Sequence, residues 1–139
     1  MKQLILPKSL MARIEQEARQ SFPRECCGLL EGVWEGDIAH LRAVHPAPNL
    51  SAEADRFEIA PDAHFAALKG ARARGQAIIG CYHSHPNGGA VPSPRDLAGA
   101  GEENFLWLIA AATGTAVELA AFVYFSGGFG EIGLVTGAE

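Results

Sequence analysis

The sequence is poor in the features that mark nucleic-acid binders, secreted proteins and disulfide scaffolds. Residues 97–139 contain five Glu and no Lys or Arg, and the whole chain carries a formal net charge of −5, which argues against a basic surface for nucleic acid. The three cysteines do not make an even disulfide framework. The apolar run at residues 4–6 is too short for the core of a signal peptide. We therefore expect a protein of the reducing cytoplasm that does not bind nucleic acid.

Long hydrophobic runs are also scarce, and the one candidate is interrupted. From Phe105 to Gly130 the only charged residue is Glu118, and a run of that length could span a membrane. Breaker residues at 113–115 and 127–128 divide it, as turns between strands do. We predict two buried strands joined by a turn, and no membrane partner.

What the chain does contain is the composition of a globular domain. It has 139 residues, of which 48% are hydrophobic and 19% are charged, enough for one core without cross-links. No repeat or low-complexity linker divides it. We therefore predict a single domain over residues 1–139.

Hydrophobic periodicity and breaker residues predict a mixture of strands and helices. Leu10, Ile14 and Ala18 share one face of the first helix, and Phe65 and Leu68 are expected to face inward on the second. The predicted strands cover residues 3–6, 26–33, 38–44, 56–59, 76–82, 105–111, 117–125 and 131–135, and the predicted helices cover residues 7–20, 61–75 and a short segment after residue 93. The predicted fold class is α/β (α+β), with a mixed sheet sandwiched by helices.

The densest cluster of metal-ligand residue types lies at His83-Ser84-His85 and is followed by Asp96. Side chains alternate along a strand, so His83 and His85 would project from the same face. Asp96 can provide a third ligand if the intervening glycine-rich loop folds back. Two imidazoles and one carboxylate leave a fourth tetrahedral position for water, which is the pattern of a catalytic zinc site rather than a closed structural one. A zinc ion there would acidify the water and polarise a carbonyl group.

The segment from Ser93 to Asp96 also has a purely structural interpretation. Ser93 at the N-cap, Pro94 at the first helical position and Asp96 at the third make a good helix start. The two interpretations are compatible, because a helix start is a rigid place for a ligand.

Metal-assisted hydrolysis needs a general base, and Glu25 is the best candidate in the sequence. It directly precedes an apolar run at residues 26–30, where a solvated acid is not expected. A carboxylate beside a metal could take a proton from water and pass it to a leaving amine. The alternative is that Glu25 pairs with Arg24 or with a helix end, and the residues alone leave both open.

These residues together form a specific pattern. Glu25 lies well upstream, His83-Ser84-His85 follows, seven residues separate the second His from Ser93, and two residues separate Ser93 from Asp96. This arrangement resembles the JAMM metalloproteases, the catalytically competent (MPN-plus) branch of the MPN domain. The segment at residues 23–30 is also similar to the compact bacterial members, such as the Mec+ sulfur-carrier-protein peptidases. The likeness covers nearly the whole chain.

The resemblance implies a role for each motif residue. His83, His85 and Asp96 would bind one Zn²⁺ ion per chain. Glu25 would be the general base and acid, and Ser93 would donate a hydrogen bond to the tetrahedral oxyanion. The implied fold is an MPN-like mixed sheet between helices, with a cytidine-deaminase-like layering. The implied reaction is hydrolysis of a peptide or isopeptide bond without a covalent enzyme intermediate.

The resemblance also implies a substrate class. The compact relatives act on ubiquitin-like sulfur-carrier proteins, from whose Gly-Gly C-terminus they trim a residue or release a conjugate. Such a tail could pair with an exposed strand edge, for which residues 56–59 are the candidate. The chain lacks the long insertions with which eukaryotic members grip ubiquitin, so we expect no recognition of long ubiquitin chains. The alternative function is an MPN-type module that binds or assembles proteins without turnover.

The remaining chemical groups leave alternatives open. Cys81 could be a thiol near the metal or a small buried hydrophobe, and the second is typical of free cysteine. A thiol nucleophile at Cys26 or Cys27 would need an activating base, and metal binding explains the histidine pair better. A zinc deaminase needs a Pro-Cys-x-x-Cys segment, which the sequence lacks. Asn49 is typical of a turn. Iron, cobalt or manganese would also suit two His and one carboxylate.

Overall fold

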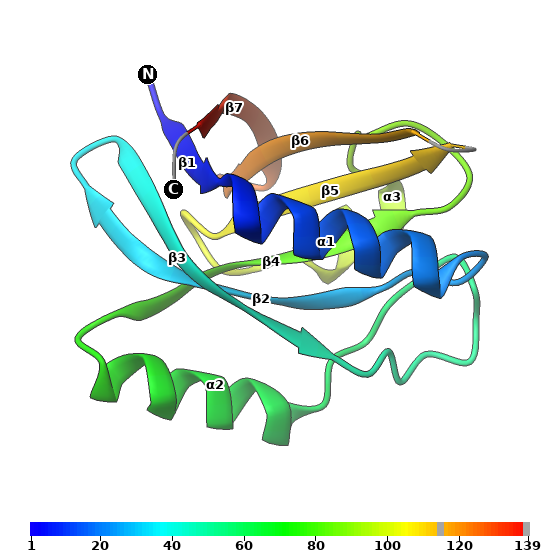
Figure 1. Cartoon of the computed structure of the whole chain (residues 1–139), viewed down its shortest axis with the longest axis horizontal. Coiled ribbons are helices and arrows are strands. Elements are labelled where there is room, and N and C mark those ends of the chain that lie inside the picture. The colour runs from blue at the N-terminus through cyan, green and yellow to red at the C-terminus, as the bar shows by residue number, and fades with distance from the viewer. Residues whose placement is uncertain (114–115, 138–139) are drawn as a thin grey trace.

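The computed structural model describes residues 1–113 and 116–137 (Figure 1). The strands in these residues are β1 (Gln3–Pro7), β2 (Cys27–Glu35), β3 (Ile38–Ala47), β4 (Ala77–His85), β5 (Leu106–Thr113), β6 (Ala116–Phe125) and β7 (Gly128–Gly137). They form one mixed sheet that closes on itself in the spatial order β1-β3-β2-β4-β5-β6-β7. The pairs β1–β3, β1–β7 and β4–β5 are parallel, and the other neighbours are antiparallel.

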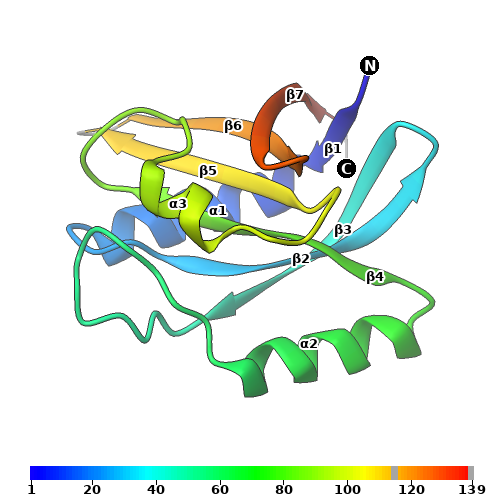
Figure 2. The same cartoon turned by 180° about the vertical axis from the view of Figure 1, so that it is seen from behind.

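Helices lie on both faces of this sheet. They are α1 (Lys8–Ser21), α2 (Pro61–Ala73) and the short α3 (Pro94–Gly99). α1 packs against β1, β5 and β7, whereas α2 packs against β2 and β4. Figure 1 shows α1 in front of the sheet, and the view from behind in Figure 2 brings α3 to the front. The predicted α/β class with a mixed sheet between helices is therefore confirmed. The closure of the sheet was not predicted.

β5 explains the long apolar run in the sequence. Leu106, Leu108 and Ala110 belong to the core that α1 covers, while Trp107 and Ile109 belong to the core that α2 covers. A strand buried on both faces needs apolar side chains at every position. β5 pairs with β6, so two strands are present as predicted, but β6 is buried only at residues 121–123 and the prediction that both strands are buried holds for β5 alone. The predicted turn between them falls largely on residues 114–115, outside the described residues. Within the described residues, no helix is long and apolar enough to cross a membrane.

The inward face of α2 differs from the prediction. Ala67 and Ala71 are buried, whereas Phe65 is 64% exposed and Leu68 is 36% exposed. The predicted inward orientation of Phe65 and Leu68 is wrong, because the small alanine side chains let the helix approach β2 and β4 closely. The ring of Phe65 lies instead 5.6 Å from Lys69 Nζ at the surface.

The predicted strand at residues 56–59 is also wrong. The backbone there is irregular, and its polar groups bond to the loop that precedes it. The Leu50 amide donates to the Glu58 carbonyl at 2.9 Å, and the Asn49 side chain bonds both the Arg56 carbonyl and the Glu58 amide. A strand edge needs unpaired backbone groups, so this segment does not offer the edge that a substrate tail was predicted to use.

Candidate metal centre

β4 extends beyond the predicted strand end at Tyr82 and carries both histidines. His83 and His85 project from the same face, as strand alternation requires, and both are buried. β2 and β5 pair with the two edges of β4, so the imidazoles sit at the end of a central strand. Ser84, between them, accepts the Cys26 amide at 2.8 Å and ties β4 to the chain just before β2.

Asp96 comes from the first turn of α3. Ser93 caps this helix, because its Oγ accepts the Asp96 amide at 3.1 Å while Asp96 Oδ2 accepts the Ser93 amide at 2.9 Å. This reciprocal capping box, followed by Pro94, satisfies amides that a helix start leaves unpaired. The structural interpretation of the segment is therefore right. The same cap also holds the Asp96 carboxylate against the two imidazoles.

Three ligand-type atoms converge at this point. His83 Nε2 lies 3.0 Å from His85 Nε2, and Asp96 Oδ2 lies 3.1 Å from the first and 3.2 Å from the second. Four ligands placed about 2.0–2.1 Å from a zinc ion in a tetrahedron are separated from one another by roughly 3.3 Å. The triangle therefore fits a tetrahedral divalent ion with its fourth position open.

The ring orientations of the two histidines are set in different ways. His85 Nδ1 lies 3.0 Å from the Gly89 carbonyl, which places a proton on Nδ1 and leaves Nε2 as the ligand atom. His83 Nδ1 is buried without a hydrogen-bond partner in the described structure. Its ring is stacked on Phe57, with centroids 4.6 Å apart and planes 21° apart, and meets the edge of Trp107 at 5.8 Å. Aromatic packing thus orients His83 where a hydrogen bond orients His85.

The electrostatics of the triad suit a cation. Burial lowers the pKa of His83. Burial disfavours the charged form of Asp96, but its contacts with His83 and His85 outweigh it and hold the pKa of Asp96 well below its usual value. Burial also opposes charge on His85, yet contacts with Asp96 and Gly89 raise its pKa. An ionised carboxylate beside a neutral His83 is the protonation state that metal ligation needs.

Glu25 lies beside this triad in an apolar setting. It is 6% exposed, and its Oε1 has no hydrogen-bond partner in the described structure. Burial, opposed by the charge of His85, raises the pKa of Glu25 to about 7. The sequence left open that Glu25 pairs with Arg24. The Arg24 side chain instead donates to the Ser51 carbonyl. A buried carboxyl group with a pKa near 7 can both accept and release a proton at neutral pH.

A cavity of about 410 Å³ brings these groups to one surface. Glu25, His85 and Ser93 line it together with Asp55 and Arg95. Ser93 Oγ is an acceptor in the helix cap, so the cap does not use its hydroxyl hydrogen. The cavity therefore presents a carboxylate, an imidazole and a hydroxyl donor to a molecule that enters it.

A second cavity, of about 400 Å³, is lined in part by Asp96. Its lining includes Phe57, Trp107 and Cys81. Burial raises the pKa of the Cys81 thiol far above its usual value, so Cys81 fits the small buried hydrophobe of the sequence analysis. Burial likewise raises the pKa values of Cys26 and Cys27 to about 12, which does not suit a thiolate nucleophile.

Two features of the site were missed in the sequence. Phe57 was predicted to lie in a strand, and nothing in its spacing indicates that it stacks on His83. Glu31, His45 and Arg74 form a second charge cluster, in which only Glu31 is buried and Arg74 is 52% exposed. The polar Glu31 inside an apolar run was the available signal for that cluster, because a buried carboxylate needs partners.

Comparisons with known proteins agree on one family. The model of the prokaryotic homologues of the JAB domain matches residues 7–123. A desampylase of Haloferax volcanii is 31% identical over 107 residues, which are 76% of each chain. A probable TtuB-protein conjugate cleaving protease of Thermus thermophilus is 36% identical over 95 residues, which cover 68% of this chain and 61% of that protein.

Two solved structures share the fold of this chain. The solution structure of a protein from Desulfitobacterium hafniense has a TM-score of 0.88 and 31% identity, covering 98% of this chain and 94% of that one. A protein from Salinibacter ruber has a TM-score of 0.72 and 31% identity, with coverage of 99% and 92%. The resemblance to the JAMM (MPN-plus) metalloproteases is therefore confirmed, and the chain belongs to the prokaryotic homologues of the JAB domain.

Proposed function

We propose that this chain is a zinc-dependent peptidase or isopeptidase of the JAMM type. In this proposal residues 1–139 form one catalytic domain that hydrolyses a peptide or isopeptide bond at the C-terminal tail of a small ubiquitin-like sulfur-carrier protein. The observation that carries it is the convergence of His83, His85 and Asp96 on one point, next to a buried carboxyl group with a pKa of about 7. We keep the cytoplasm as the expected location, where free thiols stay reduced.

The names of the relatives support the substrate class. One relative is a desampylase, and another is a probable protease that cleaves TtuB-protein conjugates. Conjugates of this kind join a small carrier to a second protein, so the scissile group is an amide that an extended tail must bring into the site. His85 of the triad and Glu25 border a cavity that opens at the surface, which is where a flexible tail can reach.

In the mechanism that we propose, His83, His85 and Asp96 hold the cation. A bound zinc ion supplies Lewis-acid polarisation of the substrate carbonyl and acidification of a water molecule. The capping box on α3 fixes the Asp96 carboxylate, and the Gly89 carbonyl fixes the tautomer of His85. These contacts keep the ligand atoms in place before substrate arrives, which limits the reorganisation that binding would cost.

Glu25 moves the proton. It accepts a proton from water as the water oxygen bonds to the carbonyl carbon, and it then gives that proton to the amide nitrogen as the carbon–nitrogen bond breaks. The second proton of the water also passes to the amine, so the products are a carboxylate on the tail and an ammonium group on the leaving group. The raised pKa of Glu25 suits both half-steps, because a group with a pKa near the working pH can do both.

Ser93 stabilises the developing negative charge. Ser93 lines the cavity that Glu25 and His85 also line, and the helix cap leaves its hydroxyl hydrogen for a substrate oxygen. A donor in this position is preorganised, because the N-cap holds the serine in place.

The test uses a ubiquitin-like carrier protein that ends in Gly-Gly, extended by a short peptide or joined to a lysine side chain. We expect the wild-type chain to release the carrier with a Gly-Gly terminus, and a chelator to stop the reaction until zinc is restored, both read by intact-mass spectrometry. Metal analysis of the purified chain identifies the bound ion among zinc, iron, cobalt and manganese. A well-folded, metal-free chain that cleaves none of these substrates even with added zinc would contradict the proposal and favour the binding module.

A further inference from the structure

The segment from Asn49 to Glu58, which we call the strap, borders both cavities beside the metal site. Ala54 and Asp55 line the first cavity, and Phe57 and Glu58 line the second. The strap has no regular secondary structure. Apart from the backbone bond between Leu50 and Glu58, its path must therefore be held by side-chain contacts.

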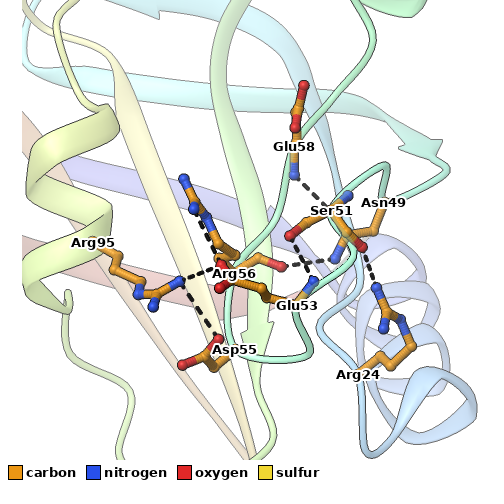
Figure 3. Close-up of polar contacts among 8 residues, drawn as sticks. All are labelled: Arg24, Asn49, Ser51, Glu53, Asp55, Arg56, Glu58 and Arg95. Atoms are coloured by element: carbon orange, nitrogen blue, oxygen red, sulfur yellow. Dashed lines mark hydrogen bonds and ion pairs between the residues drawn. The ribbon is translucent and has the colours of Figure 1, made fainter.

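The side chain of Asn49 makes four hydrogen bonds that hold this path. Oδ1 accepts the amides of Ser51 and Glu58, both at 3.0 Å. Nδ2 donates to the carbonyl of Arg56 at 3.0 Å and to the carbonyl of Glu25 at 3.1 Å. A carboxamide has two donor hydrogens and two acceptor lone pairs, so every hydrogen-bonding group of Asn49 is used. Figure 3 shows the three of these bonds that lie within the strap.

The fourth bond reaches the proposed base. β2 begins at Cys27, so the carbonyl of Glu25 lies outside the ladder that β2 forms with β3 and β4. The amide of the next residue, Cys26, is held by Ser84 Oγ. The Asn49 side chain thus bonds the carbonyl of Glu25 from the strap, and the Ser84 side chain bonds the amide of Cys26 from β4.

The other anchors of the strap are weaker or serve the metal ligands. Arg95 on α3 bonds Glu53 at 2.8 Å and lies 3.6 Å from Asp55 (Figure 3), but these groups are about half-exposed or more, and such ion pairs contribute little. Phe57 stacks on His83. Arg24 also reaches the strap, through a bond from its exposed side chain to the Ser51 carbonyl, whereas Asn49 is the anchor that bonds the backbone of Glu25 itself.

We propose that Asn49 is a positioning residue, which fixes the strap and the backbone of Glu25 relative to each other so that the carboxylate is aimed into the first cavity. The proposal rests on the function proposed for Glu25. Loss of the Asn49 carboxamide should misplace the base while the metal ligands, which come from β4 and α3, stay in position. A misplacement of about 1 Å in a reacting group can cost on the order of 100-fold in rate.

The experiment compares Asn49→Ala with Ser51→Ala in the zinc-loaded full chain. Ser51 Oγ accepts only the Glu53 amide within the strap, and the Asn49 bond to Ser51 uses the backbone amide, so Ser51→Ala leaves all four Asn49 bonds in place. We expect Asn49→Ala to lower kcat by ten-fold or more, with KM changed less and with zinc affinity within two-fold of wild type. We expect Ser51→Ala to keep the wild-type kcat. Equal kcat values for Asn49→Ala and wild type, or loss of zinc from Asn49→Ala, would overturn the proposal.

A second variant covers the case in which Asn49→Ala does not fold. Asn49→Asp keeps the acceptor for the two strap amides and removes the donors to Arg56 and Glu25. NMR amide exchange should then stay slow at Ser51 and Glu58, while kcat still falls. A wild-type kcat in Asn49→Asp would overturn the proposal. If the wild-type chain itself hydrolyses no substrate, the proposed function fails separately, and fast exchange at Ser51 and Glu58 in Asn49→Ala still tests the tether.

Discussion

Glu25 and Glu31 are six residues apart, and their buried carboxylates have opposite environments. Glu25, just before β2, is 6% exposed, and Glu31, within β2, is 1% exposed. Arg74 donates to Glu31 Oε2 at 2.9 Å and to its Oε1 at 2.6 Å, and His45 lies 2.7 Å from Oε1. Glu25 instead keeps an oxygen without any partner in the described structure. One oxygen of Glu25 therefore lacks a hydrogen bond. Both oxygens of Glu31 have partners, and we call Glu31 with His45 and Arg74 the saturated cluster.

The difference appears in their acidity. Hydrogen bonds from Arg74 lower the pKa of Glu31, whereas burial raises the pKa of Glu25 to about 7. A saturated carboxylate stays charged and holds elements together, here β2, β3 and the end of α2. An unsatisfied one lies close to the energy of its protonated form and can exchange a proton during a reaction. Burial and a missing partner do not by themselves identify a functional acid, because Glu17 Oε1 is also buried without a partner in the described structure. Glu25 combines both features with a place on the cavity that His85 lines.

The largest expected difference between Glu25 and Glu31 is in turnover, measured after the charge of each is removed. Glu25→Gln should lower kcat by roughly 10²- to 10⁴-fold, because a positioned general base contributes about that much, with zinc content unchanged. Glu31→Gln should keep kcat near the wild-type value. Steady-state hydrolysis of a carrier conjugate gives both numbers. Equal losses in the two variants would mean that the two carboxylates do not differ in function.

The contribution of the Ser93 hydroxyl to turnover is tested by removing it, with zinc affinity as the check on Asp96, which the same residue caps. Ser93→Gly should lower kcat by about 10²- to 10³-fold, the usual cost of one oxyanion donor. Its thermal stability should fall only slightly, because Gly replaces Ser at an N-cap at a cost of a few tenths of a kcal/mol. Ser9→Gly in α1 is a control for loss of a serine hydroxyl elsewhere, and it should leave kcat unchanged. A Ser93→Gly variant that keeps its kcat would remove Ser93 from the mechanism.

The free energy of unfolding should fall more in Glu31→Gln than in Glu25→Gln, which is the reverse of the order expected for kcat. Glu31→Gln should lower the free energy of unfolding by about 1–3 kcal/mol, since it weakens charged hydrogen bonds to a buried group. Glu25→Gln should leave the free energy of unfolding at pH 7.5 equal or higher, because it removes a buried carboxylate that lacks partners. Urea titrations at pH 7.5 measure both. A larger loss in Glu25→Gln than in Glu31→Gln would show that Glu25 is the structural carboxylate.

The two carboxylates should also act in different pH ranges in the metal-free chain. The folded pKa of Glu25 is raised from 4.5 to about 7, so its contribution to stability is present below pH 4.5 and is lost as the pH rises towards 7. The folded pKa of Glu31 is lowered, so its contribution is present above pH 4.5 and is lost as the pH falls further.

Glu25→Gln should therefore flatten the stability profile between pH 4.5 and 7 by up to one bound proton, which is about 1.4 kcal/mol per pH unit. Glu31→Gln should flatten it below pH 4.5. Urea midpoints across the pH range check this, and a Glu25→Gln profile parallel to that of wild type between pH 4.5 and 7 would contradict the raised pKa.

Part of the fold and of the candidate site could be predicted from the sequence. The strands, both long helices and the short α3 follow from periodicity and from breakers such as Pro94, which are local properties of the chain. The spacing of His83 and His85 on one strand face, and the cap that contains Asp96, are local as well. These parts of the site could therefore be placed in advance.

The remaining parts of the site depend on contacts between residues that are far apart in the sequence. Glu25 and Glu31 look alike in the sequence, and only the approach of Arg74 to Glu31 distinguishes them. Phe57 was assigned to a strand because its neighbours alternate, but Asn49 satisfies the backbone of that segment and turns it into a loop that covers His83. The exposed position of Phe65 follows from close packing of Ala67 and Ala71 on the sheet, which a pattern of apolar residues does not reveal.

The most direct test of the account is a calorimetric titration of zinc into the metal-free chain, compared with the same titration of His83→Ala and of His45→Ala. His45 is the matched control, because it is the histidine of the saturated cluster. We predict one tightly bound zinc per chain in the wild type and in His45→Ala, and no tight site in His83→Ala. Tight binding that survives in His83→Ala, or a wild-type chain that binds no zinc, would contradict the convergence of His83, His85 and Asp96 on one metal ion.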